Sequence, residues 1–384
     1  MRSRIMKAVL KTALVAGALF GAGTSFAADV NLRAVPDNNT AAGGAVVWRF
    51  VCDAGNAPDT CIQTGEEAPT IRVSSAESLT INLANDLPVP VSIMIPGQLG
   101  DTSIRRQADG RVVTFAQETG PGGTGVYTWG TPPTPLKPGT YLFQSGTAPQ
   151  LQVPMGLFGA LVVTDPGYPA GVTVDNETLL LFSEIDLVQN GRVAAAASGG
   201  AQPTEACVSM NDYEASGMTA IGYPCTIDYD PTYYLVNGVS APNLTDLTAN
   251  STVHLRMLNA GLRTHTPAFV NLEMSIFAED GNIYPGQPLQ HSQAMLAAGK
   301  TLDAIMALPD VADLTIALND RSPSFSDDNQ PTGGARAAIV IGAGSDVTTG
   351  NTIEEVISVI EDTPFQWDPP GGNALRIAGG ASHG

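Results

Sequence analysis

Apolar and polar residues alternate along most of the chain in short runs. Residues 45–53 (AVVWRFVCD) and 70–86 (TIRVSSAESLTINLAND) have the two-residue period of β-strands, the second as strand, turn and strand. Further runs of this kind in the first half are VSIMI (91–95), GRVVTFAQ (110–117), GVYTWGTP (125–132), KPGTYLFQSGT (137–147) and GLFGALVVTDP (156–166). Short strands at this spacing predict a Greek-key β-sandwich.

A second set of strands follows the turn-rich segment DPGYPAG (165–171), which is a natural domain boundary. ETLLLFSEIDLV (177–188) is predicted to be a strand, and the Gly- and Ala-rich segment 194–230 a surface excursion. Strands resume in TYYLVNGVSAP (232–242), STVHLRMLNAG (251–261), VNLEMSIFAEDG (270–281), LDAIMALP (302–309), ADLTIALNDR (312–321) and ARAAIVIGAG (335–344). A second sandwich is therefore expected.

The pattern thus predicts an all-β chain of two tandem Greek-key sandwiches, one over 28–170 and one over 171–345. The composition agrees, because only 14% of residues are charged while 41 Gly and 28 Pro supply turns. Residues 322–334 are predicted to be a loop, and 346–384 a largely flexible tail with one short apolar stretch at 353–361.

The N-terminus has the features of a secretory signal peptide over residues 1–27. A basic N-terminal region is followed by an apolar run from Ala13 to Ala22. The sequence SFA then forms a small-x-small cleavage site that ends at Ala27. That run is too short to span a bilayer, and no later segment reaches the required length. We therefore expect an exported protein, periplasmic or extracellular, without a transmembrane segment after signal removal.

The mature chain is predicted to be strongly acidic. The formal charge is −19, and the signal carries four basic and no acidic residues, so its removal gives −19 − 4 = −23. Such a surface repels nucleic acid and anionic lipid, which excludes both as expected partners. An acidic surface would attract metal ions or a basic protein. Alternatively, the negative charge only keeps an exported protein in solution.

Four cysteines form two local pairs, Cys52 with Cys61 and Cys207 with Cys225. Four cysteines allow three pairings in an oxidising compartment, and short loop closure favours the local one. Neither pair has the C-x-x-C spacing of a redox or zinc site. We therefore interpret both as structural disulfides.

Two stretches of the chain resemble known copper proteins. Residues 68–98 and 137–166 are similar to the first cupredoxin domain of a multicopper oxidase. Residues 233–309, with the phrases LNAG, AEDG and AAGKTLD, resemble the next cupredoxin domain of that family, in the version that carries few copper ligands. Together the similar segments cover roughly 45–343, so the resemblance implies two cupredoxin-like sandwiches.

The copper ligands implied by this resemblance are replaced. The family's segment that matches Ser92–Gly97 runs Ser-apolar-His-Trp-His-Gly, and Met94 and Pro96 stand at its two imidazoles. The segment that matches Tyr141–Gly146 would hold two more imidazoles, where Gln144 and Gly146 stand. The proline side chain has no donor atom for a metal, and the methionine thioether is a soft ligand suited to Cu(I). The resemblance therefore implies an oxygen-reducing copper cluster that these four positions cannot hold.

A blue-copper site is not expected either. It needs a cysteine and two histidines with a weak axial ligand, but none of the four cysteines here has a neighbouring histidine. Assembly into a ring can create sites between chains, yet it cannot supply side chains that no chain contains.

Four histidines remain as candidate metal ligands. His254 alternates with apolar neighbours in TVHLRML, so it is predicted to be a solvent-facing strand residue. His265 lies near the point where the family's copper domains begin a ligand cluster, but it lacks a second histidine two residues on, so a loop or core position is expected. His291 and His383 are expected to be exposed. A mononuclear site would combine one of these with Met94, Met155 or a carboxylate.

Other motifs give weaker signals. Met94 and Met155 could capture Cu(I), although methionine on an apolar strand usually fills a core. The acidic segment SFSDDNQ (324–330) lacks the spacing of a calcium loop, and Gly-rich GPGGTG (120–125) lacks the Lys-Ser/Thr of a phosphate loop.

Two alternative functions are therefore considered. The first is an exported multicopper-oxidase-like protein without the trinuclear and type 1 copper ligands, needing no cofactor and acting as a non-catalytic binding or assembly module. Its partner would be another extracytoplasmic protein or a second copy of itself. The alternative is a copper-binding oxidoreductase with a non-standard or inter-subunit site, which requires histidines, methionines or carboxylates to converge.

Overall fold

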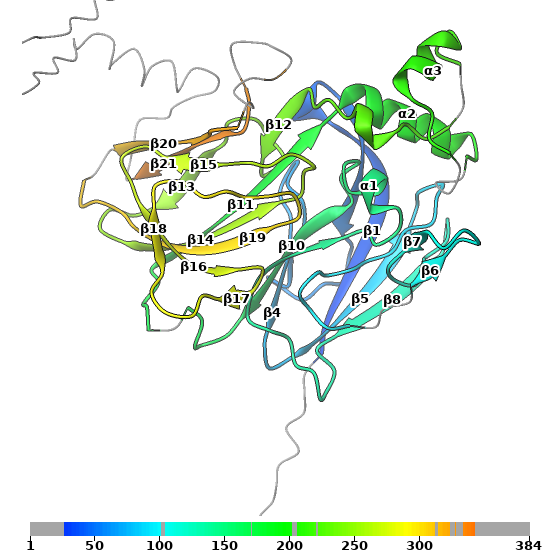
Figure 1. Ribbon diagram of the computed structural model, residues 1–384. Coiled ribbons are helices and arrows are strands. Elements are labelled where there is room, and N and C mark those ends of the chain that lie inside the picture. The colour runs from blue at the N-terminus through cyan, green and yellow to red at the C-terminus, as the bar shows by residue number, and fades with distance from the viewer. Residues whose placement is uncertain are drawn as a thin grey trace, which may run out of the picture.

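The computed structural model describes residues 27–341, except 101–103, 170, 202–205, 220–221, 312–313, 323–326 and 328–332 (Figure 1). Most of the predicted signal peptide, the predicted tail and its apolar stretch, most of the loop 322–334 and His383 lie outside the described residues. Within the described part, no helix has the length and apolar character needed to cross a membrane.

Two four-stranded sheets form the first half of the molecule. One has the order β2-β1-β5-β8 and the other β3-β4-β10-β9. The strands of the first sheet are β1 (Ala27–Asn39), β2 (Ala45–Cys52), β5 (Ser78–Asn85) and β8 (Thr124–Trp129). Those of the second are β3 (Cys61–Ile62), β4 (Thr70–Ser74), β9 (Gly139–Gln144) and β10 (Phe158–Thr164).

Alternation places the core of this first sandwich between its two sheets. In β5 the side chains of Leu79, Ile81 and Leu83 are buried, while the residues between them are half-buried. Ile71 and Val73 of β4 meet the same core from the opposite sheet. Each fully buried aliphatic side chain stabilises the fold by about 1.5–3 kcal/mol, so the period-two pattern fixes which face of each strand points inward.

The second half contains a seven-stranded and a four-stranded sheet. The larger sheet has the order β12-β11-β14-β19-β16-β17, with β18 also paired to β16, and the smaller has the order β13-β21-β20-β15. The larger sheet comprises β11 (Asn176–Ile185), β12 (Tyr233–Val236), β14 (Thr252–Asn259), β16 (Met274–Glu279), β17 (Asn282–Ile283), β18 (Leu289–His291) and β19 (Thr301–Ala307). The smaller comprises β13 (Asn243–Leu247), β15 (Pro267–Phe269), β20 (Leu314–Asp320) and β21 (Arg336–Ile341). The all-β, two-sandwich architecture is confirmed.

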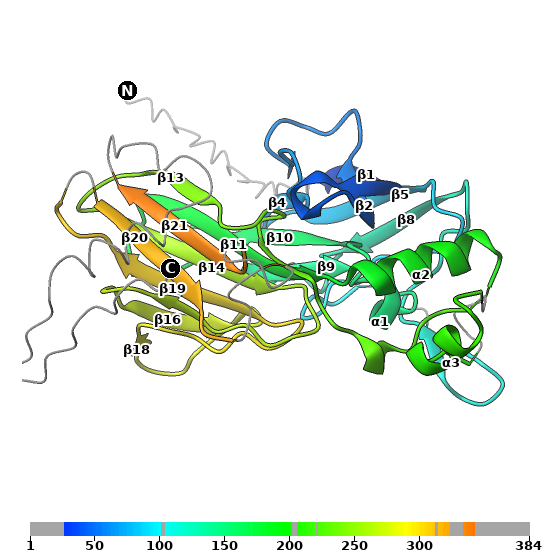
Figure 2. The ribbon, with the colours of Figure 1, turned by 90° about the horizontal axis from the view of Figure 1, so that it is seen from above.

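The two sandwiches pack directly against each other. Strand β9 of the first lies against β14 and β19 of the second, and Figure 2 shows β9, β10, β11 and β14 in the middle of the molecule. Leu142 and Ala160 from the first sandwich share an apolar cluster with Leu181, Leu258 and Ala260 from the second. Consequently β14 is covered on both faces, and seven of its eight residues are buried.

The segment between β11 and β12 differs from its prediction. The strand predicted over 177–188 ends at Ile185, and Asp186 caps the helix α2 (Leu187–Ser198) by accepting a hydrogen bond from the Gln189 N–H. Val193 and Ala196 of this helix pack into the core of the first sandwich, so the excursion predicted from residue 194 begins inside a partly buried helix. The other helical elements are α1 (Pro149–Gln152), α3 (Met210–Ala215), η1 (Thr40–Ala42) and η2 (Thr226–Asp228).

Three further segments differ from the pattern. The strand β1 lies where no strand was predicted, and it pairs with both β2 and β5. VSIMI (91–95) makes only isolated bridges, from Val91 to Thr119 and from Met94 to Gln144. In GRVVTFAQ (110–117) only β7 (Val112–Thr114) is a strand, and it pairs with β6 (Arg105–Arg106) in a separate two-stranded sheet.

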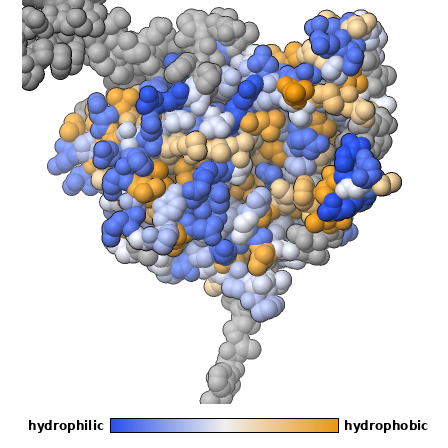
Figure 3. Space-filling view, in the orientation of Figure 1, coloured by the Kyte–Doolittle hydropathy of each residue, from blue (hydrophilic) through white to orange (hydrophobic). Residues whose placement is uncertain are grey.

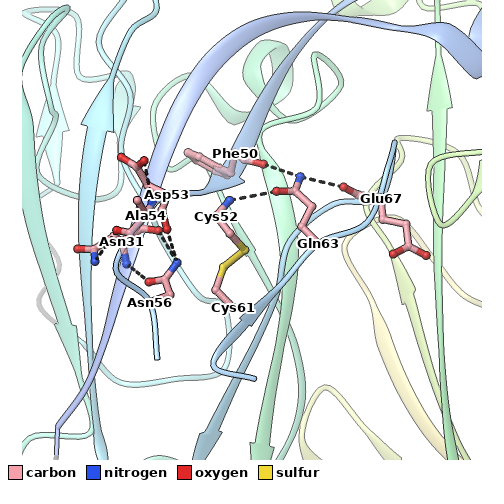
Figure 4. Close-up of a disulfide and its surroundings, with 9 residues drawn as sticks. All are labelled: Asn31, Phe50, Cys52, Asp53, Ala54, Asn56, Cys61, Gln63 and Glu67. Atoms are coloured by element: carbon pink, nitrogen blue, oxygen red, sulfur yellow. Dashed lines mark hydrogen bonds between the residues drawn. A yellow bond between two sulfur atoms is a disulfide. The ribbon is translucent and has the colours of Figure 1, made fainter. Parts of the chain in front are cut away.

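Both predicted disulfides, Cys52–Cys61 and Cys207–Cys225, are present. The first ties the end of β2 to β3, and Figure 4 shows the Gln63 amide beside it. Gln63 accepts from the Cys52 N–H at 3.0 Å and donates to the Phe50 and Glu67 carbonyls at 3.3 and 3.0 Å. The Cys52–Cys61 disulfide and the Gln63 side-chain amide thus both hold the C-terminal end of β2.

Candidate functional site

The positions where copper ligands were expected lie at a junction of two backbone segments in the first sandwich. Met94 and Gln144 pair through their backbones, with N–H to oxygen distances of 2.8 and 3.0 Å in the two directions. Both side chains are half-buried. Pro96 is exposed two residues further on. The fold therefore brings two of the four positions together.

Hydroxyl and amide groups occupy the space beside this junction. Thr147 donates from Oγ1 to Ser92 Oγ at 2.9 Å, and its Oγ1 lies 3.3 Å from Thr114 Oγ1. Ser145 Oγ donates to Gln152 Oε1 at 2.6 Å, and Gln152 Nε2 donates to the Pro90 carbonyl at 2.9 Å.

All five polar side chains of this group are buried, with exposed fractions of 0–4% for Ser92, Thr114, Ser145, Thr147 and Gln152. We call them the hydroxyl network. Buried polar groups are stable when they satisfy one another in this way.

Gly146 lies within the hydroxyl network and has little room for a side chain. A Cβ atom there would come within 3.0 Å of Ser92 Oγ and 3.5 Å of the Ala116 Cβ. The backbone carbonyl of Gly146 also accepts from the Phe115 N–H at 2.9 Å. A residue larger than glycine requires neighbouring atoms to move, because the packing is already tight.

His254 is buried, with 2% of its surface exposed, so its prediction as a solvent-facing residue is wrong. The reason is that β14 is a central strand that the first sandwich covers, and alternation gives solvent exposure only on strands with one free face. Its Nε2 lies 2.9 Å from Asp303 Oδ1, and its ring is 6.0 Å from that of Tyr168.

Asp303 is the centre of an ionic network between the two sandwiches. Besides His254, this fully buried carboxylate accepts from Thr140 Oγ1 at 2.6 Å, Tyr168 OH at 2.8 Å and Arg256 Nη1 at 3.1 Å. Burial alone would raise the pKa of Asp303, but the hydrogen bond from His254 and the charge of Arg256 bring it below its ordinary value. Arg256 also pairs with Glu177 at 2.7 Å, and Glu177 pairs in turn with Arg72 from β4 of the first sandwich.

His265 is buried with 1% exposed, as expected for a core histidine. Both of its ring nitrogens face carboxylates: Nδ1 lies 2.6 Å from Asp320 Oδ2 and Nε2 lies 2.8 Å from Glu184 Oε1. Burial lowers the pKa of His265, yet the hydrogen bonds to Asp320 and Glu184 outweigh it and raise the pKa to about 9. Glu184 is held in turn by the Leu262 N–H and the Tyr229 hydroxyl.

These histidines do not converge on one site. In the pairing of β14 with β11, His254 lies opposite Glu177 at one end of β11. His265 contacts Glu184 at the other end of that strand. Seven residues of strand separate the two glutamates, which corresponds to about 23 Å.

The remaining candidates lie elsewhere in the fold. His291 is exposed on β18, as expected, and Met155 is fully buried in the core of the first sandwich. Among the described residues, no group of three or more His, Cys, Asp or Glu side chains is arranged to hold a metal ion.

The side chains around the expected ligand positions do not fit a copper cluster of the oxygen-reducing type. Such clusters use imidazole nitrogen, whereas this region offers hydroxyl, amide and thioether groups. A copper-ligating histidine also needs one ring nitrogen with a free lone pair, and both nitrogens of His265 already face carboxylates.

The buried charges were missed by reasoning from the sequence, although a signal for them exists. Glu184, Arg256 and Asp303 each interrupt an apolar strand run, in LLLFSEI, HLRML and TLDAIMA. A charge inside such a run is seldom buried unless it is paired. Three such residues in one sheet therefore indicate buried ion pairs.

The sheet architecture defines two cupredoxin-like β-sandwiches joined by this network. Residues 56–167 match the family model described as Multicopper oxidase. No curated protein matches the sequence at a significant level.

Solved copper proteins share the fold of most of the chain. The blue copper oxidase from Nitrosomonas europaea is 18% identical with a TM-score of 0.56, over 82% of this chain and 85% of that one. The laccase from Botrytis aclada is 18% identical with a TM-score of 0.57, over 85% and 55%. The copper nitrite reductase from Nitrosomonas europaea is 17% identical with a TM-score of 0.54, over 84% and 96%. The resemblance to the multicopper oxidase family is thus confirmed, by sequence over 56–167 and by fold over most of the chain.

Proposed function

We propose that this chain is an exported multicopper-oxidase-like protein without an oxygen-reducing copper centre, which acts as a non-catalytic binding or assembly module. Its partner is another extracytoplasmic protein or a second copy of the chain. Export is supported by the apolar leader and by two disulfides, which persist in oxidising compartments. Nucleic acid is not a partner, because the chain carries a formal charge of −19.

The hydroxyl network is the observation that carries this proposal. It fills the neighbourhood of Met94, Gln144 and Gly146 with side chains that already satisfy one another's hydrogen bonds. A copper cluster needs donors with free lone pairs directed into a shared space. Here Ser92 Oγ and Gln152 Oε1 already accept hydrogen bonds from Thr147 and Ser145. Ser92 and Ala116 also crowd the backbone at Gly146.

The alternative is a copper-binding oxidoreductase with a non-standard or inter-subunit site. Such a site would have to use the histidines that remain. His254 and His265 are engaged by buried carboxylates that compensate their charge, so metal binding would leave those carboxylates without their present partners. Among the three histidines that the structure describes, His291 is exposed and is the best placed for a site shared between copies.

Copper binding and oxidase turnover test the proposal together. The mature chain is purified, incubated with excess Cu(I) under anaerobic conditions or with Cu(II) in air, and freed of unbound metal. Elemental analysis then gives the copper content, electron paramagnetic resonance gives the type of any Cu(II) site, and oxygen uptake is followed with a phenolic substrate. We expect a colourless protein with substoichiometric copper and no oxygen uptake.

The blue copper oxidase from Nitrosomonas europaea, loaded in the same way, is the positive control. Stoichiometric copper with turnover in the sample would overturn the proposal. Copper that binds stoichiometrically and is lost in a His291→Gln variant would support the shared-site alternative.

A further inference from the structure

An apolar groove opens on the outer face of the seven-stranded sheet. Its volume is about 330 Å³, and none of the described residues that line it is charged. Phe277 from β16 and Ile305 from β19 line it from the sheet, and Ile283, Tyr284 and Pro288 line it from β17 and the connection to β18. Figure 1 shows β19, β16 and β17 side by side in the lower part of the second sandwich. We call this hollow the β17 groove.

The β17 groove belongs to the face of the sheet that points away from the core of the second sandwich. Three alternate residues of β19 pack in that core, namely Leu302, Ala304 and Met306. Alternation therefore turns Asp303 and Ile305 to the opposite face. Asp303 meets Thr140 of the first sandwich there, whereas Ile305 is half-buried in the wall of the groove. The first sandwich thus covers this face at Asp303 and leaves it open at Ile305.

Large apolar side chains at the β17 groove are open to water. Ile283 is 55% exposed and Val172 is 42% exposed, and both line the groove. Figure 3 shows apolar side chains among hydrophilic ones on the surface of the second sandwich, at the left of the view. Removal of apolar surface from water is favourable. A segment with a matching apolar side would therefore be stabilised by covering the groove.

Residues 352–361 (TIEEVISVIE), which lie outside the described residues, have the sequence of such a segment. Four apolar residues recur at the spacing i, i+3, i+4 and i+7 of one helix side: Ile353, Val356, Ile357 and Ile360. Thr352, followed three residues later by Glu355, matches the capping box that begins a helix. A helix of about ten residues is marginal by itself in water. Its formation therefore depends on an apolar surface that it can cover.

The chain is long enough to place this segment in the β17 groove. Strand β21 ends at Ile341, which pairs with Leu314 at the start of β20. Leu314 is nine residues from Ile305, a stretch of at most about 30 Å, and paired strands lie about 5 Å apart. Ile341 and the groove are therefore separated by at most about 35 Å, whereas the connection 342–352 can span about 40 Å when extended.

We propose that residues 353–361 bind as an amphipathic helix in the β17 groove of the same chain, with their apolar side toward Phe277, Ile283 and Ile305. The glutamates of the segment then face solvent on the other side of the helix. A segment tethered in this way has an effective concentration on the order of millimolar, which favours it over the same segment of a second copy. The bound helix would compete with any other partner for this surface. The inference stands independently of the copper-free function.

Hydrogen exchange followed by mass spectrometry tests the proposal on the full mature chain. A segment that is docked about 90% of the time exchanges its amides about tenfold more slowly than a free one. We expect slowing of about tenfold or more at 353–361, relative to a synthetic peptide of residues 351–364, at every protein concentration. Exchange at the rate of the peptide overturns the proposal. Slowing that appears only at high concentration, together with a dimer in light scattering, overturns the assignment to the same chain.

Two variants locate the contact. Ile357→Asp places a charge on the apolar side of the segment, and its matched control Ser358→Asp places the same charge on the polar side. Ile283→Asp places a charge in the groove, and its control is Val126→Asp at a 64% exposed position of β8 in the first sandwich. We expect both site variants to return residues 353–361 to the exchange rate of the peptide, and both controls to keep the slowing. Unchanged exchange of the β14 amides shows that each variant is folded. Slowing that persists in folded Ile283→Asp refutes the groove as the binding site.

Discussion

The His265 imidazolium predicts a specific loss of stability at alkaline pH. In the folded chain its pKa is raised to about 9, whereas an unfolded histidine titrates near 6.5. A raised pKa means that the folded state binds the proton more tightly, so this contribution to stability is complete below about pH 6.5. It is lost as the pH rises through about 9.

The size of the effect follows from these two pKa values. The difference of about 2.5 pH units, at about 1.4 kcal/mol per unit, corresponds to about 3.5 kcal/mol of unfolding free energy. The groups that face the ring are Asp320 from β20, Glu184 from β11 and, behind Glu184, the Tyr229 hydroxyl. Burial and the nearby Glu184 hold the pKa of Tyr229 well above its ordinary value, so that tyrosine keeps its proton through the same range.

Urea unfolding at pH 6.5 and 9.5 measures this contribution. The variant Asp320→Asn removes one of the two carboxylates that hold the proton, so its stability should fall less over this range than that of the unchanged chain. His291→Gln, at an exposed position, is the control and should behave like the unchanged chain. Direct titration of the His265 ring by NMR gives its pKa independently. A ring that titrates near 6.5, or equal pH dependence in Asp320→Asn, would refute the reasoning.

Two further substitutions test the packing and the charges. Gly146→Ala should lower the unfolding free energy by about 1–3 kcal/mol, because the added Cβ crowds Ser92. The control Gly120→Ala adds its Cβ in open space and should have little effect. Urea titration compares the two variants, and equal stability would contradict the crowding at Gly146. Asp303→Ala should lower the unfolding free energy by about 3–5 kcal/mol, because Arg256 then keeps a buried charge without this partner; a loss below 1 kcal/mol in thermal unfolding would show that the network contributes little.

The strands could be predicted because their signal is local. Alternation in residues such as Leu79, Ile81 and Leu83 is set by burial of one face, and the same residues form the core of the first sandwich. The helix α2 was missed because its first residues continue the apolar run of β11. The Asp186 cap and the Ala-rich stretch that follows were the available signals for it.

The candidate site was less predictable because its partners come from distant parts of the chain. Thr140, Arg256 and Asp303 meet only after β9 packs against β14 and β19. His254 was predicted to face solvent because alternation shows which side of a strand a residue faces. Alternation cannot show that the first sandwich covers that side of β14. Met94 and Gln144 were singled out through the family resemblance, and their backbone pairing follows from the fold.

The copper content of the mature protein, measured by elemental analysis after exposure to excess copper and removal of unbound metal, tests the central proposal most directly. We predict substoichiometric copper, because the hydroxyl network offers no imidazole where the family resemblance expects four. A full complement of copper in the first sandwich, accompanied by oxygen consumption with a phenolic substrate, would contradict that prediction.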